Sequence, residues 1–184
     1  MAITTKYDGI EYRSRLEARW AAFMKNIGWE IVYEPFDGDG YIPDFLVQGE
    51  RPLLIEVKPA ATQKEYGAAV PKAEKGLASH WRHDILIVGI SPYWVSDDGI
   101  ESDHVAGMLG EFDSYEGSWQ WDLGRWFTCR ACGHISVFHS TSSFSGRPCG
   151  HYDGNGHILS PPISLMQSMW ADACNDVKWK GRQA

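Results

Sequence analysis

The sequence has no long apolar run, no excess of positive charge and no cysteine before Cys129. Its hydrophobic stretches all fall short of the roughly 18 residues that a membrane-spanning helix needs, and no apolar signal core follows Met1. We therefore expect a cytoplasmic protein without a membrane partner. The net charge of −7 argues against binding of nucleic acid through one large basic surface. With 43% hydrophobic and 22% charged residues, the composition is that of a globular chain and excludes general disorder.

Charge and cysteine are unevenly distributed along the 184 residues, a length that suits one domain with a small appendage. We expect a body at 1–95, an acidic connection at 96–118, a cysteine-bearing part at 119–160, and a helix with a tail at 161–184. The connection contains Gly and Ser and no Lys or Arg, so we interpret it as a solvated loop. Alternatively, its negative charge serves to repel DNA or to bind a basic partner.

The pattern of apolar residues predicts an α/β fold with a mixed sheet. Residues at helical spacing predict a helix over about 13–27 that Gly28 ends. The predicted order over the body is helix, strand, strand, strand, helix, strand. A last helix is expected near the C-terminus, and Pro71 is expected to start or kink the second helix. The ranges are 29–34, 41–47, 53–57 and 84–90 for the strands, 63–81 for the second helix and 162–179 for the last.

Two carboxylates and a lysine fall on neighbouring strands of this prediction. If the second and third strands pair as a hairpin, positions symmetric about residue 50 lie opposite each other, and Asp44 and Glu56 are such a pair. Lys58 shares the face of Glu56 because side chains alternate along a strand. Adjacent carboxylates repel each other unless a cation lies between them, and Mg²⁺ is a natural occupant. On the first helix, Glu17 either faces this pair or forms an i,i+4 ion pair with Arg13 at the rim of the core.

The same residues resemble the sequence elements of the PD-(D/E)XK nucleases, which belong to the restriction-endonuclease-like superfamily. Pro43-Asp44 is similar to the PD element, Glu56-Val57-Lys58 is similar to the (D/E)XK element, and Glu17 matches an acidic residue of the first core helix. The predicted order of elements matches the family core, and the resemblance covers about residues 7–92. More narrowly, four segments resemble a group of small phage and bacterial proteins of this superfamily: 12–20, 33–35, 41–45 and 55–59.

The resemblance implies phosphodiester hydrolysis in DNA by a phage or mobile-element protein that acts in a bacterial host cell. By this similarity, Asp44 and Glu56 ligate Mg²⁺ or Mn²⁺ together with the backbone carbonyl of Val57. Lys58 then serves the attacking water. Glu17 orients a second metal ion or a metal-bound water. These four side chains, Glu17, Asp44, Glu56 and Lys58, are the expected catalytic residues.

Four cysteines in a cytosolic chain indicate metal binding rather than disulfide bonds. Cys129 and Cys132 form a C-x₂-C knuckle, and Cys149 with His151 supplies a second half. We expect these four residues to hold a structural Zn²⁺ in a zinc ribbon, because a segment of about 40 residues needs such a staple. The alternatives are an unpaired Cys149 in a loop, or another fourth ligand. The rival fourth ligands are His134, His157 and Cys174.

Several functional alternatives remain open. The chain can be a non-catalytic module that binds DNA, or one that inhibits a host protein through its acidic surface. A nuclease directed at RNA is a third hypothesis. A homodimer or a protein partner would be needed to cut both strands of a duplex, whereas a monomer would nick. In some members of the family a basic residue of the second helix assists, and the candidates here, Lys72 and Lys75, are otherwise solvated surface residues.

Overall fold

The computed structural model describes residues 3–38, 40–95, 101–102, 105–139, 143–151 and 159–178. Its helices are α1 Arg15–Asn26, α2 Gln63–Leu77 and α3 Ile163–Asp176. The strands of the first half are β1 Thr5–Tyr7, β2 Ile10–Tyr12, β3 Ile31–Tyr33, β4 Phe45–Val47, β5 Leu53–Val57 and β6 Asp84–Val88. Those of the second half are β7 Trp94–Val95, β8 Glu101–Ser102, β9 Val105–Asp113, β10 Ser118–Thr128, β11 Ile135–His139 and β12 Ser143–Arg147.

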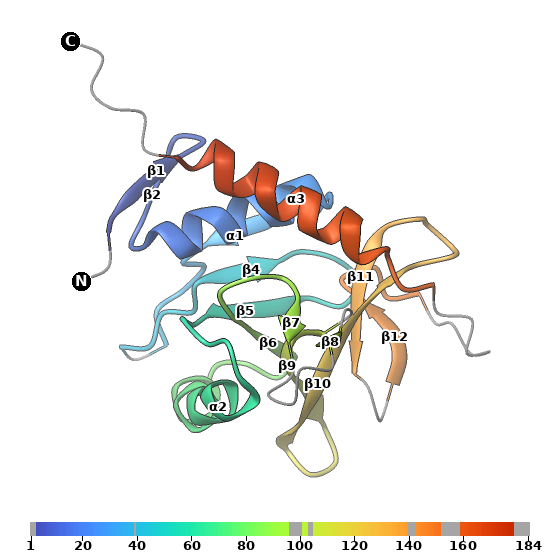
Figure 1. Cartoon of the computed structure of the whole chain (residues 1–184). Coiled ribbons are helices and arrows are strands. Elements are labelled where there is room, and N and C mark those ends of the chain that lie inside the picture. Colours follow the sequence, from blue (N-terminus) through green and yellow to red (C-terminus); the bar gives the residue numbers. More distant parts are fainter. Residues whose placement is uncertain are drawn as a thin grey trace.

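One curled, mixed sheet lies at the centre of the described residues (Figure 1). It has eight strands in the order β12-β11-β10-β9-β6-β5-β4-β3. β5 and β6 are parallel and are joined through α2, whereas the other neighbouring strands of this sheet are antiparallel. Two small hairpins, β1-β2 and β7-β8, are separate from it.

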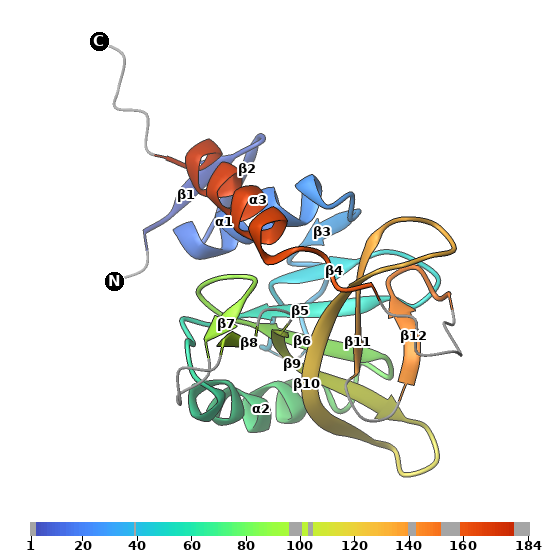
Figure 2. The same cartoon turned by 45° about the vertical axis from the view of Figure 1, so that its right-hand side comes forward.

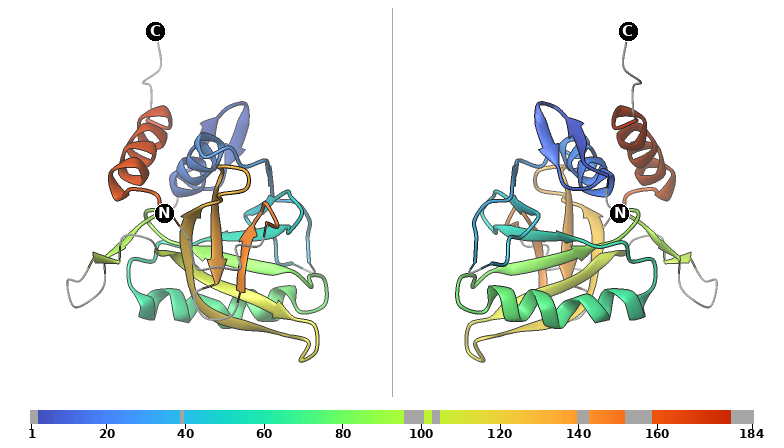
Figure 3. Two further views of the ribbon diagram at one scale, coloured as in Figure 1. Left: turned by 90° about the vertical axis from the view of Figure 1, so that its right-hand side faces the viewer. Right: turned by 90° about the vertical axis from the view of Figure 1, so that its left-hand side faces the viewer.

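The helices cover both faces of this sheet (Figures 2 and 3). α1 and α3 lie side by side over one face, and α2 lies under the other (Figure 3). Along β5, Leu53 and Ile55 join the core formed with α1 and α3, whereas Leu54 packs with Leu77 of α2. This alternation follows from the period of two in a strand, and burial of both faces explains why β5 is apolar almost throughout.

Aromatic residues fill the space between the sheet, α1 and α3. Trp20 of α1 and Trp170 of α3 have ring centroids 5.2 Å apart, and Phe23 packs against both. Trp126 of β10 contacts Phe23, with ring centroids 5.9 Å apart. Residues from the beginning, middle and end of the chain thus share one core, and burial of these large side chains is its main stabilising contribution.

The helices and strands predicted for the body and the last helix are confirmed, whereas β1, β2 and β7 were not predicted. α1, β3, β4, β5, α2, β6 and α3 all lie within the expected ranges. The side chain of Ser14 caps α1, and Thr62 with Glu65 forms a capping box at the start of α2. α2 begins at Gln63, so Pro71 lies inside the helix and does not start it. Among the described residues, no helix is long and apolar enough to span a membrane.

The prediction of a solvated loop at 96–118 is wrong for Val105–Asp113, which forms β9 between β6 and β10. The segments 96–100 and 103–104 lie outside the described residues. In the cysteine-bearing part, β10, β11 and β12 continue the same sheet from β9. The part expected as a ribbon therefore shares its sheet with the body.

Glycine and acidic residues, which indicate a loop in the sequence, have other roles in β9. A Cβ at Gly110 would lie 2.9 Å from the indole of Trp121. The indole packs directly on the backbone here, so the position requires glycine. Glu111 accepts a hydrogen bond from the guanidinium of Arg147 at 2.6 Å. Arg147 is fully buried and also donates to Asp84 of β6 at 2.5 Å. These ion pairs join β12, β9 and β6, and they compensate the charges that the sheet buries.

Candidate active site and metal centre

The β4–β5 hairpin brings Asp44 and Glu56 to one cavity. The observed pairing of β4 with β5 is symmetric about residue 50, which confirms the predicted register. Asp44 lies just before β4, and its side chain accepts a hydrogen bond from the backbone N–H of Val57 at 2.7 Å. This bond ties the carboxylate to the end of β5, beside Glu56.

The cavity has a volume of about 350 Å³. Glu17, Asp44, Glu56 and Lys58, the residues predicted to be catalytic, all line it, together with Val57. They come from α1, from the segment before β4, and from the end of β5 and the residue that follows it. The structure therefore brings the whole predicted set together.

Glu17 lies in the first turn of α1, and its backbone N–H donates to the capping side chain of Ser14 at 3.1 Å. Its carboxylate is buried and accepts a hydrogen bond from the hydroxyl of Tyr33 at 2.7 Å. Glu17 forms the expected ion pair with Arg13, whose Nε lies 4.0 Å from Glu17 Oε2, and it also lines the cavity of Asp44 and Glu56. The two interpretations of Glu17 are therefore compatible. Sequence reasoning assigned no role to Tyr33, which fixes this carboxylate from β3.

Burial raises the pKa of Asp44 to about 7, and the neighbouring charge of Glu56 contributes to the rise. The N–H of Val57 acts in the opposite direction, because it donates a hydrogen bond to the ionised form. Glu17 raises the pKa further, and Lys58 lowers it. The Asp44 carboxylate is thus buried without full compensation of its charge, and this favours binding of either a proton or a cation there.

Glu56 has one compensated and one uncompensated oxygen. Its Oε1 forms an ion pair with Lys58. Its Oε2 is buried and makes no hydrogen bond of ordinary geometry, and the hydroxyl of Tyr41, which neighbours Glu56, is likewise buried without a partner. Burial and the Glu56 carboxylate together raise the pKa of Tyr41, so the phenol stays neutral beside the carboxylate. A buried anionic oxygen without a partner is costly, and a bound cation would compensate it.

Arg13 contacts more than one carboxylate of the site. Its Nη2 lies 2.7 Å from Asp44 Oδ1, and its Nε lies 2.8 Å from Glu34 Oε1. Sequence reasoning considered Arg13 only as a partner of Glu17. The contact with Asp44 depends on tertiary structure, because 31 residues separate the two in the chain.

The two lysines of α2 have different positions. Lys72 is among the residues that line the cavity, whereas Lys75 is not. Lys72 is therefore the α2 lysine placed to act at this site.

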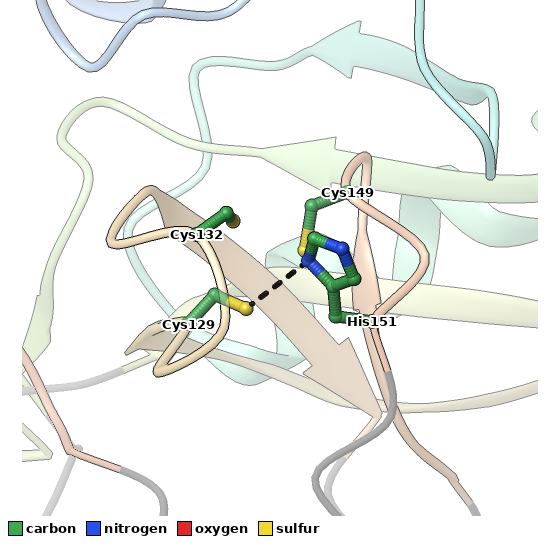
Figure 4. Close-up of side chains that lie close together, drawn as sticks. All are labelled: Cys129, Cys132, Cys149 and His151. Atoms are coloured by element: carbon green, nitrogen blue, oxygen red, sulfur yellow. Dashed lines mark hydrogen bonds between the residues drawn. The ribbon is translucent and has the colours of Figure 1, made fainter.

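A second group lies near the end of the molecule where β10, β11 and β12 meet. Cys129, Cys132, Cys149 and His151 each offer a ligand atom, and these four atoms lie within 4.8 Å of one another (Figure 4). Cys129 and Cys132 come from the turn after β10, and Cys149 and His151 follow β12. The protein thus has a Cys₃His group that can bind a metal such as zinc, with the four residues that the sequence predicts.

Hydrogen bonds shift the acidity of the thiols in this group. Burial by itself would raise the pKa of Cys129, but N–H and thiol donors, mainly from Cys132, lower it to about 7. Cys129 Sγ and His151 Nδ1 are 3.5 Å apart, and the hydroxyl of Ser136 donates to Cys149 Sγ at 3.3 Å. A thiol whose thiolate forms near neutral pH is a good metal ligand.

None of the described rivals for the fourth ligand position belongs to this group. His134 is not among the gathered side chains, and Cys174 is partly buried in α3. His157 lies outside the described residues. Of the alternatives that the sequence left open, the structure therefore gathers His151.

The loop between β12 and His151 packs on the turn of the β4–β5 hairpin. The backbone N–H of Arg51 donates to the carbonyl of Pro148 at 3.2 Å. A Cβ at Gly49 would lie 2.4 Å from the same oxygen, so only glycine permits this approach. The hairpin therefore carries the carboxylates at its open end and the Cys₃His loop at its turn.

Comparison of the chain with models of protein families, with curated proteins and with solved structures finds no match. Among the described residues, the Cys₃His group is also the one set of three or more Cys, His, Asp or Glu side chains gathered closely enough to hold a metal ion by themselves. The carboxylates of the described cavity residues do not form such a set.

Proposed function

We propose that the carboxylate cavity is the active site of a Mg²⁺-dependent nuclease that hydrolyses phosphodiester bonds in DNA. The observation that carries this proposal is the uncompensated oxygen of Glu56, which is buried in the cavity that Asp44 also lines. Catalytic Mg²⁺ is commonly bound by one or two carboxylates, with waters and phosphate oxygens completing its shell. The two carboxylates and the carbonyl of Val57 fit such an ion.

The chemistry of the donor set supports the same conclusion. Both side chains offer hard oxygen ligands, and the pKa of Asp44 is raised first by burial and then by the charge of Glu56, both of which a bound divalent cation would offset. When bound, Mg²⁺ polarises a phosphoryl oxygen and acidifies a coordinated water.

The remaining residues have distinct tasks in this proposal. Lys58, held by Glu56, orients the attacking water and stabilises charge that develops on the phosphate. Glu17, held by Tyr33, would accept a hydrogen bond from a metal-bound water and so orient it. In the reaction the water gives up a proton to the solvent and its oxygen bonds to phosphorus, the bond to the leaving sugar oxygen breaks, and that oxygen takes up a proton from a solvent water.

The arrangement of the body is compatible with a restriction-endonuclease-like core. Its elements follow the order α1, β3, β4, β5, α2, β6, and the two motif segments meet at one end of the β4–β5 hairpin. Together with the sequence resemblance, this supports membership of the PD-(D/E)XK nucleases. For the Cys₃His group we propose a structural Zn²⁺, because four protein ligands leave no open position for substrate.

A second candidate function is a non-catalytic binding module with the same fold. The observation that favours it is the ion pair of Arg13 with Asp44, which already neutralises one metal ligand. In such a module the guanidinium permanently replaces the cation, and the protein binds DNA or a host protein without cleaving it.

Cleavage of supercoiled plasmid separates these functions. The wild type should nick plasmid in Mg²⁺ or Mn²⁺ but not without divalent cation, and both Asp44→Ala and Lys58→Ala should lower the rate by about 10³-fold or more. Lys64→Ala and Asp172→Ala, which change exposed side chains outside the cavity, serve as matched controls and should keep full activity.

Cleavage that persists in either cavity variant would indicate a contaminating enzyme and would contradict the proposal. Wild-type protein that binds DNA without cleaving it would support the binding module. A parallel panel of duplex DNA, single-stranded DNA, branched DNA and RNA would identify the substrate, and cleavage of RNA alone would replace DNA in the proposal.

A further inference from the structure

We propose that Arg13, anchored by Glu34, binds a backbone phosphate of the nucleic acid beside the metal ion, and that its guanidinium leaves Asp44 when the metal binds. This inference rests on the proposed function of the carboxylate cavity and names a substrate-binding residue for it.

The contacts of Arg13 divide into a fixed and an exchangeable set. Its backbone N–H donates to the hydroxyl of Tyr33 at 3.0 Å, and its Nε contacts Glu34 at 2.8 Å. Its Nη2 instead contacts Asp44, one of the two carboxylates that the proposed metal would use. The side chain is 52% exposed, so its outer nitrogens can reach a ligand in the cavity. The ion pair with Glu34 keeps the guanidinium beside the cavity when the contact with Asp44 is lost.

Glu34 has a backbone conformation that is unusual for a side chain of its type. Its φ is 46°, in the left-handed region that favours glycine, and its N–H donates to the carbonyl of Asp44 at 3.0 Å. Strain of this kind is concentrated at functional sites, where a side chain is needed in spite of its backbone cost. Here the Glu34 carboxylate is placed to hold Arg13 at its Nε.

The charges of the cavity support an exchange of partners. Two cations compete for one carboxylate, and a divalent ion with several oxygen ligands displaces a half-exposed guanidinium. The bound ion then adds two positive charges to a cavity that is otherwise balanced, and this favours entry of a phosphodiester anion. Six charged side chains line the cavity among the described residues, three cationic and three anionic: Arg13, Lys58, Lys72, Glu17, Asp44 and Glu56.

Arginine suits this second role better than lysine. Its planar guanidinium presents two parallel N–H groups that match two oxygens of a phosphate, whereas an ammonium acts as a single point charge. With Nε held by Glu34, the outer edge of the guanidinium is already oriented, so little side-chain entropy is lost on binding.

The first test is metal binding by the zinc-loaded protein without nucleic acid, followed as the decrease in the electron paramagnetic resonance signal of free Mn²⁺ during a titration. Arg13→Gln should bind Mn²⁺ about fivefold more tightly than the wild type, because a competing cation is gone. Asp44→Asn should lose this binding. Equal binding by the wild type and Asp44→Asn would overturn the proposed metal site, whereas equal binding by the wild type and Arg13→Gln would overturn only the exchange.

The second test is binding of a labelled duplex with Ca²⁺ in place of Mg²⁺, so that no cleavage occurs. Arg13→Gln should weaken binding about tenfold and reduce the slope of log affinity against log salt by about one, as expected for one lost phosphate contact. Arg13→Lys should keep the slope and recover only part of the affinity. Glu34→Gln should weaken binding less and leave the slope unchanged.

Arg82→Ala, which removes an exposed arginine outside the cavity, is the control for net charge. A structural ion pair alone would lower the melting temperature of Arg13→Gln and leave the salt dependence unchanged, and that result would refute the phosphate contact. Should Arg13→Gln fail to fold, Arg13→Lys still decides the matter, because unchanged affinity in that variant contradicts a bidentate contact.

Discussion

The two ends of the β4–β5 hairpin carry sites of opposite character. At the turn, the Cys₃His loop offers four ligand atoms within 4.8 Å of one another. At the open end, Asp44 and Glu56 meet beside Arg13 and Lys58, and one oxygen of Glu56 has no partner. The first group is complete in itself, which suits a permanent ion, whereas the second needs ligands from outside the protein. In the function proposed above, the first site stabilises the fold and the second exchanges its ligands.

The largest expected effect is the loss of folding stability when the Cys₃His group, which packs on the hairpin turn, loses its zinc. Cys149→Ser should release zinc, lower its measured content from one equivalent to none, and cost about 3 kcal/mol of unfolding free energy. Because Pro148 contacts Arg51 and Gly49, the loss should also increase amide exchange in the turn of the β4–β5 hairpin. Elemental analysis, thermal unfolding and hydrogen exchange measure these three outcomes.

Cys174→Ser is the matched control, since this partly buried thiol lies in α3, outside the group. It should retain zinc. Normal zinc content in Cys149→Ser would show that the gathered residues do not form the metal centre.

An intermediate effect is expected from pH at the open end. In the Mg²⁺-free protein the pKa of Asp44 is raised from 3.8 to about 7, so between these values the folded state binds more protons than the unfolded state. Stability should therefore fall as pH rises from about 4 to 7, on the order of 2 kcal/mol. Asp44→Asn should remove this part of the pH dependence, which denaturant titrations at several pH values measure.

The affinity for metal should change with pH in the direction opposite to that of folding stability. Mn²⁺ affinity should rise with pH up to about 7, because the ion competes with the proton on Asp44. A pH profile of stability that is identical in the wild type and Asp44→Asn would contradict the coupling of the two carboxylates.

The smallest expected effect comes from Tyr33→Phe, which removes the hydroxyl between Arg13 and Glu17. The lost hydrogen bonds should cost about 1 kcal/mol of stability and lower kcat by about fivefold, with little change in KM. Steady-state kinetics at saturating Mg²⁺ would measure kcat and KM separately. Tyr115→Phe, at an exposed turn, is the control, and an equal loss of kcat there would show that Tyr33 has no specific role.

Much of the candidate site was predictable because its determinants are local in the chain. Twelve residues separate Asp44 from Glu56, and a short turn between alternating strands leaves few registers that bury the apolar face. The spacing of Cys129 and Cys132 likewise limits how the two thiols can be arranged. The roles of Arg13 and Tyr33 were not predictable, because their partners are distant in sequence and charged or aromatic residues at helix starts and strand ends are common.

By itself, the sequence determined the helices, the hairpin register and the C-x₂-C pair, because periodicity and short spacings restrict local geometry. It left the fourth ligand open between His151, His134, His157 and Cys174, and only the structure gathers His151 with the three cysteines. Only the tertiary structure decided that Val105–Asp113 is a strand, that Arg13 contacts Asp44, and that the Cys₃His loop packs on the hairpin turn. These features depend on pairing and charge compensation between distant segments. No local pattern encodes them, because these interactions between distant segments form only when the sheet has formed.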